Sequence, residues 1–527
     1  MKKIILLFSV LVFSFSFSNG QNWLWGREGE VIGTKNSLSI DVATDIAGNA
    51  FITGVYTPGI IFWPDTLIAT NLDDIYFTKY NSAGTLLWVK DFPEDGGPRI
   101  CSDVSNNVII IGMNGSSITK CDNNGNVKWR IGARDSLGYS SPTGVTTDKF
   151  KNIFITGVFY GYLKLGTIIL NGNNRTNNIY TIKCDSNGNA LWGTMGKCIT
   201  HRRNYVNQSY GVATDLNGNS IITGNYIDSL VFGQDTLTSD VWHSTQANRL
   251  YLVKYDTAGS VLWANQTNLP SASSCDFGYC ITTDDVGNIY LGGSYVDTAS
   301  FGPYTITGGF TYGDGSSFLA KYGSTGNIIW VKNVNALLPT INSLCSDEYN
   351  YIYMAGPGGI VKMDTSGNLV CKSALSGDSY MAVDKTGNFV YQVGEFVNVF
   401  SPDTLFIGSD TLLATPDELN PYLARWQNCG TLDATNPIQS PTPTVTVFPN
   451  PSNGVFTVAF SHEELVSASQ IIEVYNTLGE KVLIETLRSA QGDNLIDISN
   501  EPNSIYLYRV LNENGRLLGS GKMIIEK

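Results

Sequence analysis

A short apolar segment that ends on a polar turn recurs seven times within the first 430 residues. In the copy at 211–224, the first segment ends at Asp215, a turn follows, and a second apolar segment ends at Gly224. The Asp recurs as Asp45, Asp103, Asp148, Asp215, Asp284, Asp347 and Asp384. Three positions later stand Gly48, Asn106, Lys151, Gly218, Gly287, Asn350 and Gly387. Asp first and Gly fourth are typical of a type I turn with a left-handed residue, so each copy predicts a β-hairpin whose turn alone explains both residues.

Each copy continues with a third strand, another tight turn and a fourth strand. At 250–263 the third strand ends on Lys254, the turn ends on Gly259, and the fourth strand reaches Trp263. The cation recurs as Lys79, Lys120, Lys183, Lys254, Lys321, Lys362 and Arg425. The closing residue recurs as Trp88, Trp129, Trp192, Trp263 and Trp330, with Cys371 in the sixth copy. Four strands in a unit of roughly 58 residues predict a β-propeller rather than a solenoid.

The seventh copy lacks a fourth strand after Arg425. The segment at 22–26, around Trp25, is similar to the fourth strand at 190–193. We therefore predict that Trp25 completes the last blade and closes a seven-bladed β-propeller over residues 21–430, because closure pairs an edge that an open array leaves exposed.

In an up-and-down blade, the tight turns lie on one face and the long, variable connections on the other. Five copies have an insertion in the long connection, as at 62–67, 232–237 and 407–412, whereas the second and sixth copies lack it. Binding residues usually lie on such variable loops. The candidate ligand residues on that face are a basic, aromatic segment formed by His201, Arg202, Arg203 and Tyr205. It could hold an anionic glycan, or it could be a solvated loop.

The composition changes after Cys429. Residues 431–444 are a Pro/Thr/Ser linker. Residues 445–527 contain short alternating segments separated by turns, which predict a small immunoglobulin-like β-sandwich. The predicted fold class is therefore all-β throughout, a propeller followed by a sandwich.

The first 20 residues have the pattern of a signal peptide. Lys2 and Lys3 precede an apolar run at 4–17, and Ser18 and Gly20 are small residues before a cut at Gln21. The alternative is a buried N-terminal strand. The run is too short to span a bilayer comfortably, and no other segment approaches a transmembrane span.

Charge and composition exclude several functions. Only 15% of the residues are charged, and 54 Gly and 27 Tyr favour many short strands. The net charge of −13 repels phosphate backbones and anionic lipid, so we expect no nucleic-acid partner. The three histidines are not at metal-ligand spacing, and the sequence has no phosphate loop or nucleophile elbow. We predict no catalytic residue, no metal ligand and no cofactor, and we lean against an enzyme.

Two further interpretations concern the repeated residues. The Asp turns could be calcium sites, but they lack the dense acidic ligands that calcium prefers. The repeated Asp and Lys could pair within each blade, worth about 0–1 kcal/mol per pair if exposed.

Nine cysteines, an odd number without a CxxC pair, give no zinc site. We interpret four of them as packing residues in columns of small or tyrosine side chains, namely Cys101, Cys121, Cys184 and Cys345. The better disulfide candidates are those nearer loops, namely Cys198, Cys275, Cys280 and Cys429. A bridge between Cys198 and Cys275 is one hypothesis.

Two family resemblances add to this. The Asp-x-x-Gly-Asn turn, the Ile-Thr-Gly and Lys-Tyr-Asp strand ends and the closing Leu-Trp resemble SBBP-type propeller repeats of bacterial secreted proteins, over about residues 22–430. This resemblance implies the fold and little of the function. Residues 445–527 resemble the type A C-terminal sorting domain of the type IX secretion system of Bacteroidetes. The matching residues are Pro449, Asn450, Pro451, Gly454, Gly479 and Tyr506, with Ser504 where the family usually has Gly.

The second resemblance implies export by the Sec pathway, periplasmic folding, passage through the outer membrane by the secretion machinery, and removal of the domain. The product is then released or attached to surface lipopolysaccharide; an accessory binding sandwich is the alternative. Our leading prediction is a secreted or cell-surface binding and adhesion protein for a polysaccharide or protein. The alternatives are an extracellular glycan hydrolase or lyase, which would need two close carboxylates in a central pocket, and a structural surface component.

Overall fold

The computed structural model divides the chain into two compact units, residues 1–431 and 432–527, and each is described by itself. The described residues are 23–527 without 33–36, 71–73, 93–97, 113–116, 133–138, 173–175, 200–206, 228, 239–247, 268–275, 309–314, 374, 376–378, 385–386, 398–403, 408–409, 414–418, 428–444, 461–469, 477–479, 488–493 and 513–516. These residues form β-strands and turns. Among them, no helix is long and apolar enough to cross a membrane.

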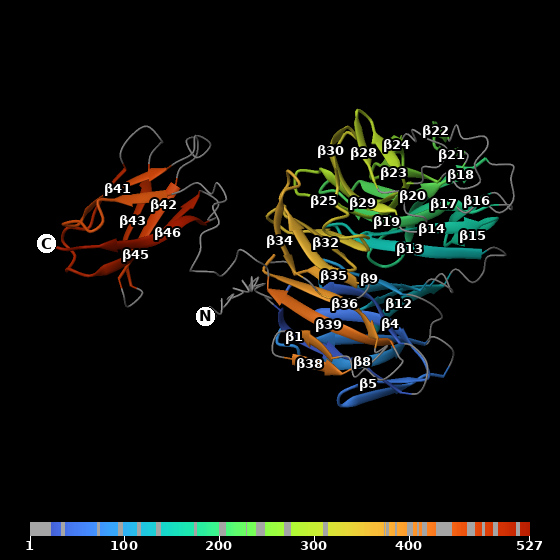
Figure 1. Cartoon of the computed structure of the whole chain (residues 1–527), viewed down its shortest axis with the longest axis horizontal. Coiled ribbons are helices and arrows are strands. Elements are labelled where there is room, and N and C mark those ends of the chain that lie inside the picture. The colour runs from blue at the N-terminus through green and yellow to red at the C-terminus, as the bar shows by residue number, and fades with distance from the viewer. Residues whose placement is uncertain are drawn as a thin grey trace, which may run out of the picture. The chain divides into compact units, whose positions relative to one another are not determined.

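The described part of the first unit contains seven antiparallel sheets with one plan of four strands (Figure 1). The first three sheets are β3 (Leu38–Thr44), β4 (Ala50–Tyr56), β7 (Asp74–Tyr80) and β8 (Leu86–Phe92); β9 (Arg99–Ser102), β10 (Val108–Gly112), β11 (Ser117–Cys121) and β12 (Val127–Gly132); and β13 (Tyr139–Thr147), β14 (Ile153–Tyr160), β17 (Asn178–Cys184) and β18 (Ala190–Cys198). The next three are β19 (Gln208–Thr214), β20 (Ser220–Tyr226), β23 (Arg249–Tyr255) and β24 (Val261–Gln266); β25 (Asp276–Thr283), β26 (Ile289–Tyr295), β29 (Ser316–Tyr322) and β30 (Ile328–Asn333); and β31 (Ser343–Ser346), β32 (Ile352–Gly356), β33 (Gly359–Met363) and β34 (Leu369–Ser373).

The seventh sheet takes its fourth strand from the N-terminal part of the chain. It consists of β35 (Ser379–Val383), β36 (Phe389–Val397), β39 (Leu419–Gln427) and β1 (Trp23–Glu28). Strand β1 pairs antiparallel with β39, and Trp25 lies opposite Arg425.

The turn after each first strand has the geometry that its Asp predicts. The Gly218 amide donates to the Asp215 carbonyl at 3.0 Å, and Asp215 Oδ1 accepts the amides of Asn217 and Asn219 at 2.9 and 3.0 Å. The fourth turn residue has a positive φ, between 61° and 83°, in all seven copies. This includes the three copies without Gly, so the hairpin prediction is confirmed.

Two columns of side chains connect neighbouring sheets. Lys254 donates to the Ser324 carbonyl in the next sheet at 3.1 Å, and the Trp263 indole N–H donates to the same oxygen at 3.3 Å. Arg425 and Trp25 of the seventh sheet donate to the Ser82 carbonyl of the first sheet. Equivalent pairs of hydrogen bonds join the second sheet to the third, the third to the fourth, and the fifth to the sixth.

Three of the repeated Asp and Lys pairs form buried ion pairs, so the energy expected for exposed pairs does not apply to them. Lys254 Nζ lies 2.9 Å from Asp215 Oδ2, and each side chain is 4% exposed. Equivalent pairs are Lys79 with Asp45 at 3.1 Å and Lys120 with Asp103 at 2.9 Å. Burial raises the pKa of Asp215, but hydrogen bonds from Lys254 and Asn219 outweigh it and hold that pKa below its usual value.

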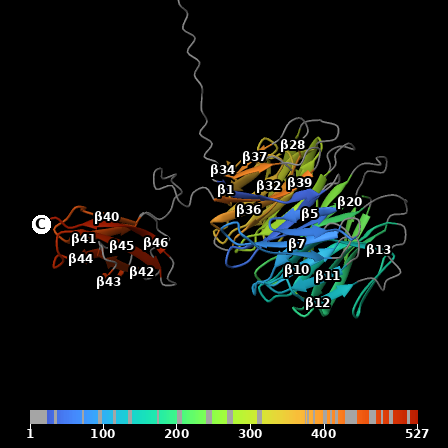
Figure 2. The ribbon, with the colours of Figure 1, turned by 90° about the horizontal axis from the view of Figure 1, so that it is seen from below.

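The first strands of the seven sheets lie side by side. In the order β3, β9, β13, β19, β25, β31 and β35, each contacts the next, and β35 also contacts β3. Figure 2 shows the first two of these sheets next to each other through β7, β10 and β11. The residue before each repeated Asp gives a hydroxyl to the main-chain oxygen of the equivalent residue one sheet away: Ser102 to Thr44, Thr147 to Ser102, Thr214 to Thr147, Thr283 to Thr214, Ser346 to Thr283 and Thr44 to Val383. Val383, which has no hydroxyl, is the one member of this column that cannot donate.

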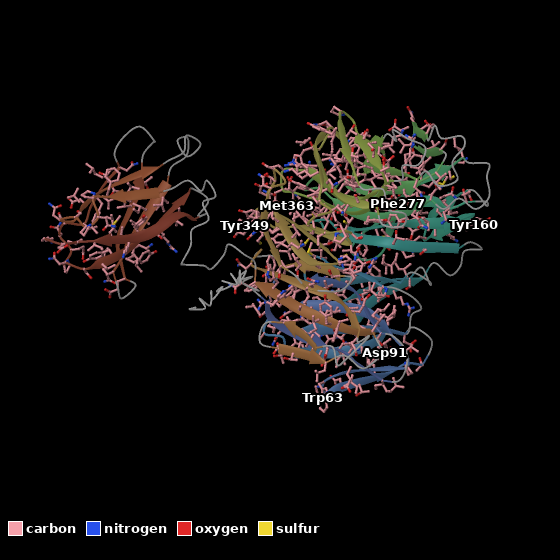
Figure 3. All side chains as sticks on the ribbon, viewed as in Figure 1. Trp63, Asp91, Tyr160, Phe277, Tyr349 and Met363 are labelled. Atoms are coloured by element: carbon pink, nitrogen blue, oxygen red, sulfur yellow. The ribbon has the colours of Figure 1, made fainter. Side chains whose placement is uncertain are left out.

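The insertions are two-stranded hairpins on the outer strands. They are β5 (Gly59–Phe62) with β6 (Asp65–Ile68), β15 (Tyr162–Leu165) with β16 (Ile168–Asn171), β21 (Ser229–Phe232) with β22 (Asp235–Thr238), β27 (Thr298–Phe301) with β28 (Tyr304–Thr307), and β37 (Thr404–Ile407) with β38 (Asp410–Leu413). The first also pairs with β2 (Glu30–Ile32), and β21 of the third hairpin pairs with β18, which extends the third sheet to six strands. Each hairpin contacts the fourth strand of its own sheet, and Figure 3 shows Trp63, at the tip of the first hairpin, at the edge of the first unit. The insertions therefore lie at the outer edge of the first unit, and the first strands of the sheets lie at its centre.

The second unit has two sheets around one core. The sheets are β40 (Val445–Phe448), β41 (Val455–Phe460) and β44 (Asn494–Asp497); and β43 (Lys481–Leu487), β42 (Gln470–Tyr475), β45 (Ile505–Asn512) and β46 (Leu517–Ile524). Phe456 and Ile496 of the first sheet share this core with Ile472 and Val510 of the second. All four side chains are fully buried.

Candidate functional site

Two cavities lie where the first strands of the seven sheets meet. We call the first the axial cup, with a volume of about 400 Å³, lined by Arg99, Thr143, Gln208, Tyr210, Tyr279, Thr340, Ile341, Asn342 and Tyr380. The second, the axial shaft, has a volume of about 350 Å³ and a lining from the first strand of every sheet, from Asp41 in β3 to Val383 in β35. The cup residues lie four to seven positions before the repeated Asp of their sheets, and the tight turns begin at that Asp. The cup therefore opens on the face with the long connections.

Arg99 supplies the positive charge in the cup. Its guanidinium donates to the Ile40 carbonyl and to the Tyr380 hydroxyl, both at 3.1 Å, and lies 4.5 Å from the centre of the Tyr380 ring. Burial lowers the pKa of Arg99, but Tyr380 and Asp41 more than offset this and raise it. Arg99 is therefore a fixed cation in the wall of the cup.

Asp41, in the adjoining shaft, is held by backbone donors. Its oxygens accept the amides of Val42 at 2.9 Å and Ile100 at 3.1 Å. Burial raises the pKa of Asp41, while Arg99 and the two amides lower it less. Asp41 is the single carboxylate among the described residues that line the cup and shaft. The paired carboxylates of a glycosidase are not present in this lining.

Aromatic rings form one side of the cup. Tyr210 and Tyr279 meet edge to face, with ring centres 5.4 Å apart, and Phe277 stacks on Tyr279 at 5.8 Å. Figure 3 labels Phe277 among the strands of the first unit. Burial raises the pKa of Tyr210 to about 12, so its hydroxyl keeps its proton at neutral pH. The cup thus combines a cation, neutral hydroxyls and amides, and exposed ring surface.

The residues predicted from sequence for the ligand face are not in this set. His201, Arg202, Arg203 and Tyr205 lie outside the described residues; the chain after them enters β19 at Gln208, a cup residue. Arg99, Asp41 and Tyr380 were not predicted from the sequence. A signal existed: four residues before the repeated Asp, the copies have Asp41, Arg99, Gly144, Gly211, Cys280, Ser343 and Tyr380. The residue type at this position differs between the copies, as expected where residues serve a ligand instead of the repeated framework.

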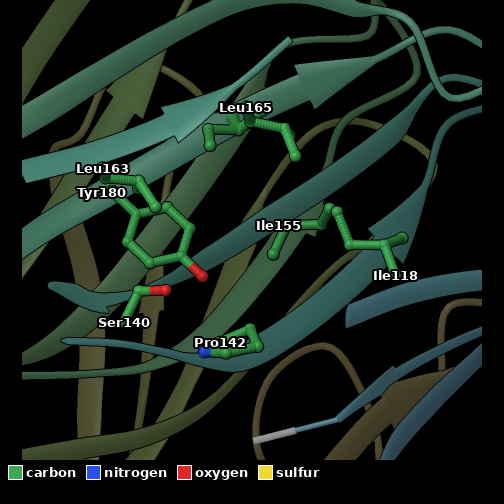
Figure 4. A pocket seen from close by; sticks show the side chains of 8 residues that line it. Ile118, Ser140, Pro142, Ile155, Leu163, Leu165 and Tyr180 are labelled. Atoms are coloured by element: carbon green, nitrogen blue, oxygen red, sulfur yellow. The ribbon is translucent and has the colours of Figure 1, made fainter. Parts of the chain in front are cut away.

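Two other features leave little room for a ligand. A cavity of about 20 Å³ between the second and third sheets, lined by Ile118, Ser140, Pro142, Ile155, Leu163, Leu165, Tyr180 and Ile182, holds about one water at most (Figure 4). In the Asp turns, the carboxylate oxygens are taken by the amides of the turn and by buried lysines. The calcium interpretation stays a prediction, and a cation there would have to displace a lysine.

The cysteines correct the disulfide hypothesis. Cys198 and Cys280 are buried thiols, so a bridge from Cys198 to Cys275 is wrong. Cys371 is disulfide-bonded, which the sequence analysis did not predict. The four cysteines assigned to packing, Cys101, Cys121, Cys184 and Cys345, are thiols with little or no exposure.

The predicted sorting motif forms a docked turn in the second unit. Asn450 Nδ2 donates to the Lys522 carbonyl at 2.7 Å, and Asn450 Oδ1 accepts the Ile524 amide at 2.9 Å. Gly454 has a φ of 113°, and a Cβ there would lie 2.4 Å from the backbone of Ser499. Tyr506 is 2% exposed and donates to the Pro502 carbonyl at 2.9 Å. Pro449 and Pro451 flank Asn450 in this turn, and Gly479 lies outside the described residues.

Comparison with known proteins gives similarities over 60% to 77% of the chain and no activity. The chain is 28% identical over 350 residues to an uncharacterized WD repeat-containing protein of Acanthamoeba polyphaga mimivirus, covering 60% of this chain and 24% of that protein. Among solved structures it is similar to a protein of unknown function from Dyadobacter fermentans (10% identity, TM-score 0.38, 76% of this chain and 99% of that one) and to a gluconolactonase from Xanthomonas campestris (8%, 0.33, 77% and 88%). These values transfer no substrate or activity. The fold rests on the described strands of the first unit, whose similar sheets, with their first strands side by side, are all-β and propeller-like.

The second unit has a more specific match. Residues 446–526 match the family described as the secretion system C-terminal sorting domain. A domain of this family engages the type IX secretion machinery. The chain therefore ends in a type IX sorting domain, and the protein is exported to the cell surface or the extracellular space.

Proposed function

We propose that this is an exported binding protein whose first unit is a closed seven-bladed β-propeller, and that its ligand enters the axial cup. Three contacts support closure between the last and first sheets: β35 with β3, Thr44 with the Val383 carbonyl, and Arg425 with the Ser82 carbonyl. A signal peptide at 1–20 is part of the same proposal.

The observation that carries the binding function is the axial cup itself. It opens on the face with the long connections and places Arg99, tyrosines and amides around about 400 Å³. Ligand pockets typically have a few placed polar groups and aromatic walls in this size range. A hydrolase or lyase is less well supported, because Asp41 is the single carboxylate in the described lining of both cavities.

The test is an array of bacterial and host glycans and surface proteins, probed with the exported protein. We expect binding that is lost when the cup is filled by Gln208→Trp. Binding that survives this variant would move the ligand site away from the cup. Absence of any binding, together with ordered self-assembly, would replace the proposal by a structural surface role.

The mature ends of the protein test the export part. We expect mass spectrometry of the exported protein to place the N-terminus at Gln21 and the C-terminus before the sorting domain. Comparison of cells with medium distinguishes attachment from release. An N-terminus at Met1 would contradict the signal peptide.

A further inference from the structure

We propose that the axial cup binds a carboxylate-bearing sugar of an acidic glycan, and that Arg99 recognises the carboxylate. This inference rests on the proposed binding function. It names the ligand class and the residue that selects it.

The first argument is the incomplete use of the Arg99 guanidinium. A guanidinium presents five N–H donors in a planar fork that matches a carboxylate. Among the described residues, Arg99 donates to the Ile40 carbonyl and the Tyr380 hydroxyl. Its other donors have no acceptor in the described part of the chain, although Arg99 lines the cup. An incoming carboxylate would supply acceptors where the cavity now offers space.

The second argument is that the protein does not neutralise this donor edge itself. Asp41 is the nearest candidate, but both of its oxygens already accept backbone amides, from Val42 and Ile100. No ion pair within 4.0 Å joins Arg99 to a described carboxylate. The charge of Asp41 raises the pKa of Arg99 without a hydrogen bond between them. The remaining guanidinium N–H groups of Arg99 are therefore available to a ligand.

The third argument concerns the rest of the cup, which fits a sugar ring. Tyr210 and Tyr279 offer ring faces and edges for the apolar face of a sugar. Thr143, Gln208 and Asn342 offer hydroxyl and amide groups that can both donate and accept hydrogen bonds with sugar hydroxyls. This combination has one cation and otherwise neutral polar groups, so it suits a ligand with one carboxylate and several hydroxyls.

The overall charge argues against other anions. A net charge of −13 repels polyanions such as nucleic acid at long range. A ligand with a single carboxylate is repelled much less, and its carboxylate gains a charge-assisted hydrogen bond with Arg99 inside the cup. The favoured occupant is therefore a glycan that contains a uronic acid.

The experiment is calorimetric titration of the exported protein with three probes: galacturonic acid, its methyl ester, and an acidic tripeptide. The ester has nearly the same shape without the charge. We expect the acid to bind about tenfold or more tightly than the ester, because a hydrogen bond to a charged group is lost. We expect Arg99→Gln to lose about tenfold or more for the acid and little for the ester, and Arg99→Lys to lose less.

Arg130→Gln, a change of an exposed arginine on β12, is the matched control and should bind as the wild type. Unfolding midpoints of all variants separate lost binding from lost folding. Equal affinity for acid and ester, or an Arg99→Gln protein that binds the acid normally, would overturn the inference and leave a binding propeller intact. Tighter binding of the tripeptide would also overturn it. The glycan and protein array decides the proposed function separately, because it does not depend on Arg99.

Discussion

The contribution of a single lysine to the stability of this protein depends on how deeply the lysine is buried. Lys254 is 3% exposed and joins Asp215 in its own sheet to the Ser324 carbonyl of the next. Removing one partner of a buried pair leaves a charge without compensation. The sequence predicted which residues pair, but not that they are buried, because the covering turn belongs to the next sheet.

We therefore predict that Lys254→Met lowers the free energy of unfolding by about 3–5 kcal/mol. Urea unfolding of the exported protein measures it. Lys164→Met, at an exposed position on the β15 hairpin, is the control and should change stability by less than about 0.5 kcal/mol. A loss below about 1 kcal/mol for Lys254→Met would mean that the pair behaves as an exposed one.

Asp276 should make stability depend on pH. It lies at the start of β25, is fully buried, and neither carboxyl oxygen forms a hydrogen bond of normal geometry with a described residue. Burial raises its pKa to about 7, although Thr267 and Arg249 act in the opposite direction. The folded state then binds more protons than the unfolded state between about pH 4 and 7, so its contribution to stability is lost as the pH rises through that window.

We expect Asp276→Asn to remove up to about 4 kcal/mol of this pH dependence. The variant should be more stable than the wild type at pH 7.5 and similar at pH 4.5 in urea unfolding. Asp235→Asn, at an exposed position on β22, should follow the wild type at both pH values. A wild-type stability that rises from pH 4.5 to 7.5 while the Asn variant stays level would contradict the assignment.

At the scale of the element, the contact between a fourth strand and the next turn organises the sheets. A Cβ at Gly259 would lie 2.8 Å from the Trp192 ring, and equivalent contacts join Gly326 to Trp263 and Gly367 to Trp330. In the sixth sheet the Trp position is Cys371. In the repeat register of the sequence, residues 427–430 correspond to that turn in the seventh copy, and they contain Cys429.

We predict that Cys371 is bonded to Cys429, so that a covalent link replaces the tryptophan contact. Cys371 is disulfide-bonded, and six of the nine cysteines are thiols, which leaves Cys275 and Cys429 as partners. Peptide mapping without reduction should give one cross-linked peptide pair that contains Cys371 and Cys429. A pair with Cys275, in the connection into the fifth sheet, would contradict the register argument.

At the scale of the whole molecule, the repeat predicted the sheets, and the similarity of Trp25 to the other closing residues predicted the partner of β39. Other features were not predictable in this way. The insertions were visible as extra residues, but their place on the outer strands depends on contacts such as Ile168 against Gly193. Arg99 and Tyr380 were hidden because they lie 281 positions apart and meet only when the last sheet lies near the second.

The proposed closure should therefore limit the stability of the first unit. Trp25 is 7% exposed, its indole N–H donates to the Ser82 carbonyl at 3.1 Å, and its ring covers Gly84. We predict that Trp25→Ala costs about 3–5 kcal/mol, since the fourth strand of the seventh sheet then loses its main anchor on the first sheet. Thermal unfolding and size-exclusion chromatography should show a lower midpoint and association through the β39 edge.

The matched comparison is Leu24→Ala. Leu24 is the neighbour of Trp25 on the same strand and is 36% exposed, so its removal should cost less than about 1 kcal/mol. Equal losses for the two variants would mean that β1 is held by backbone pairing alone and that the ring does not depend on Trp25. A large loss for Trp25→Ala alone would assign closure to one side chain that joins the two ends of a repeat array of more than 400 residues.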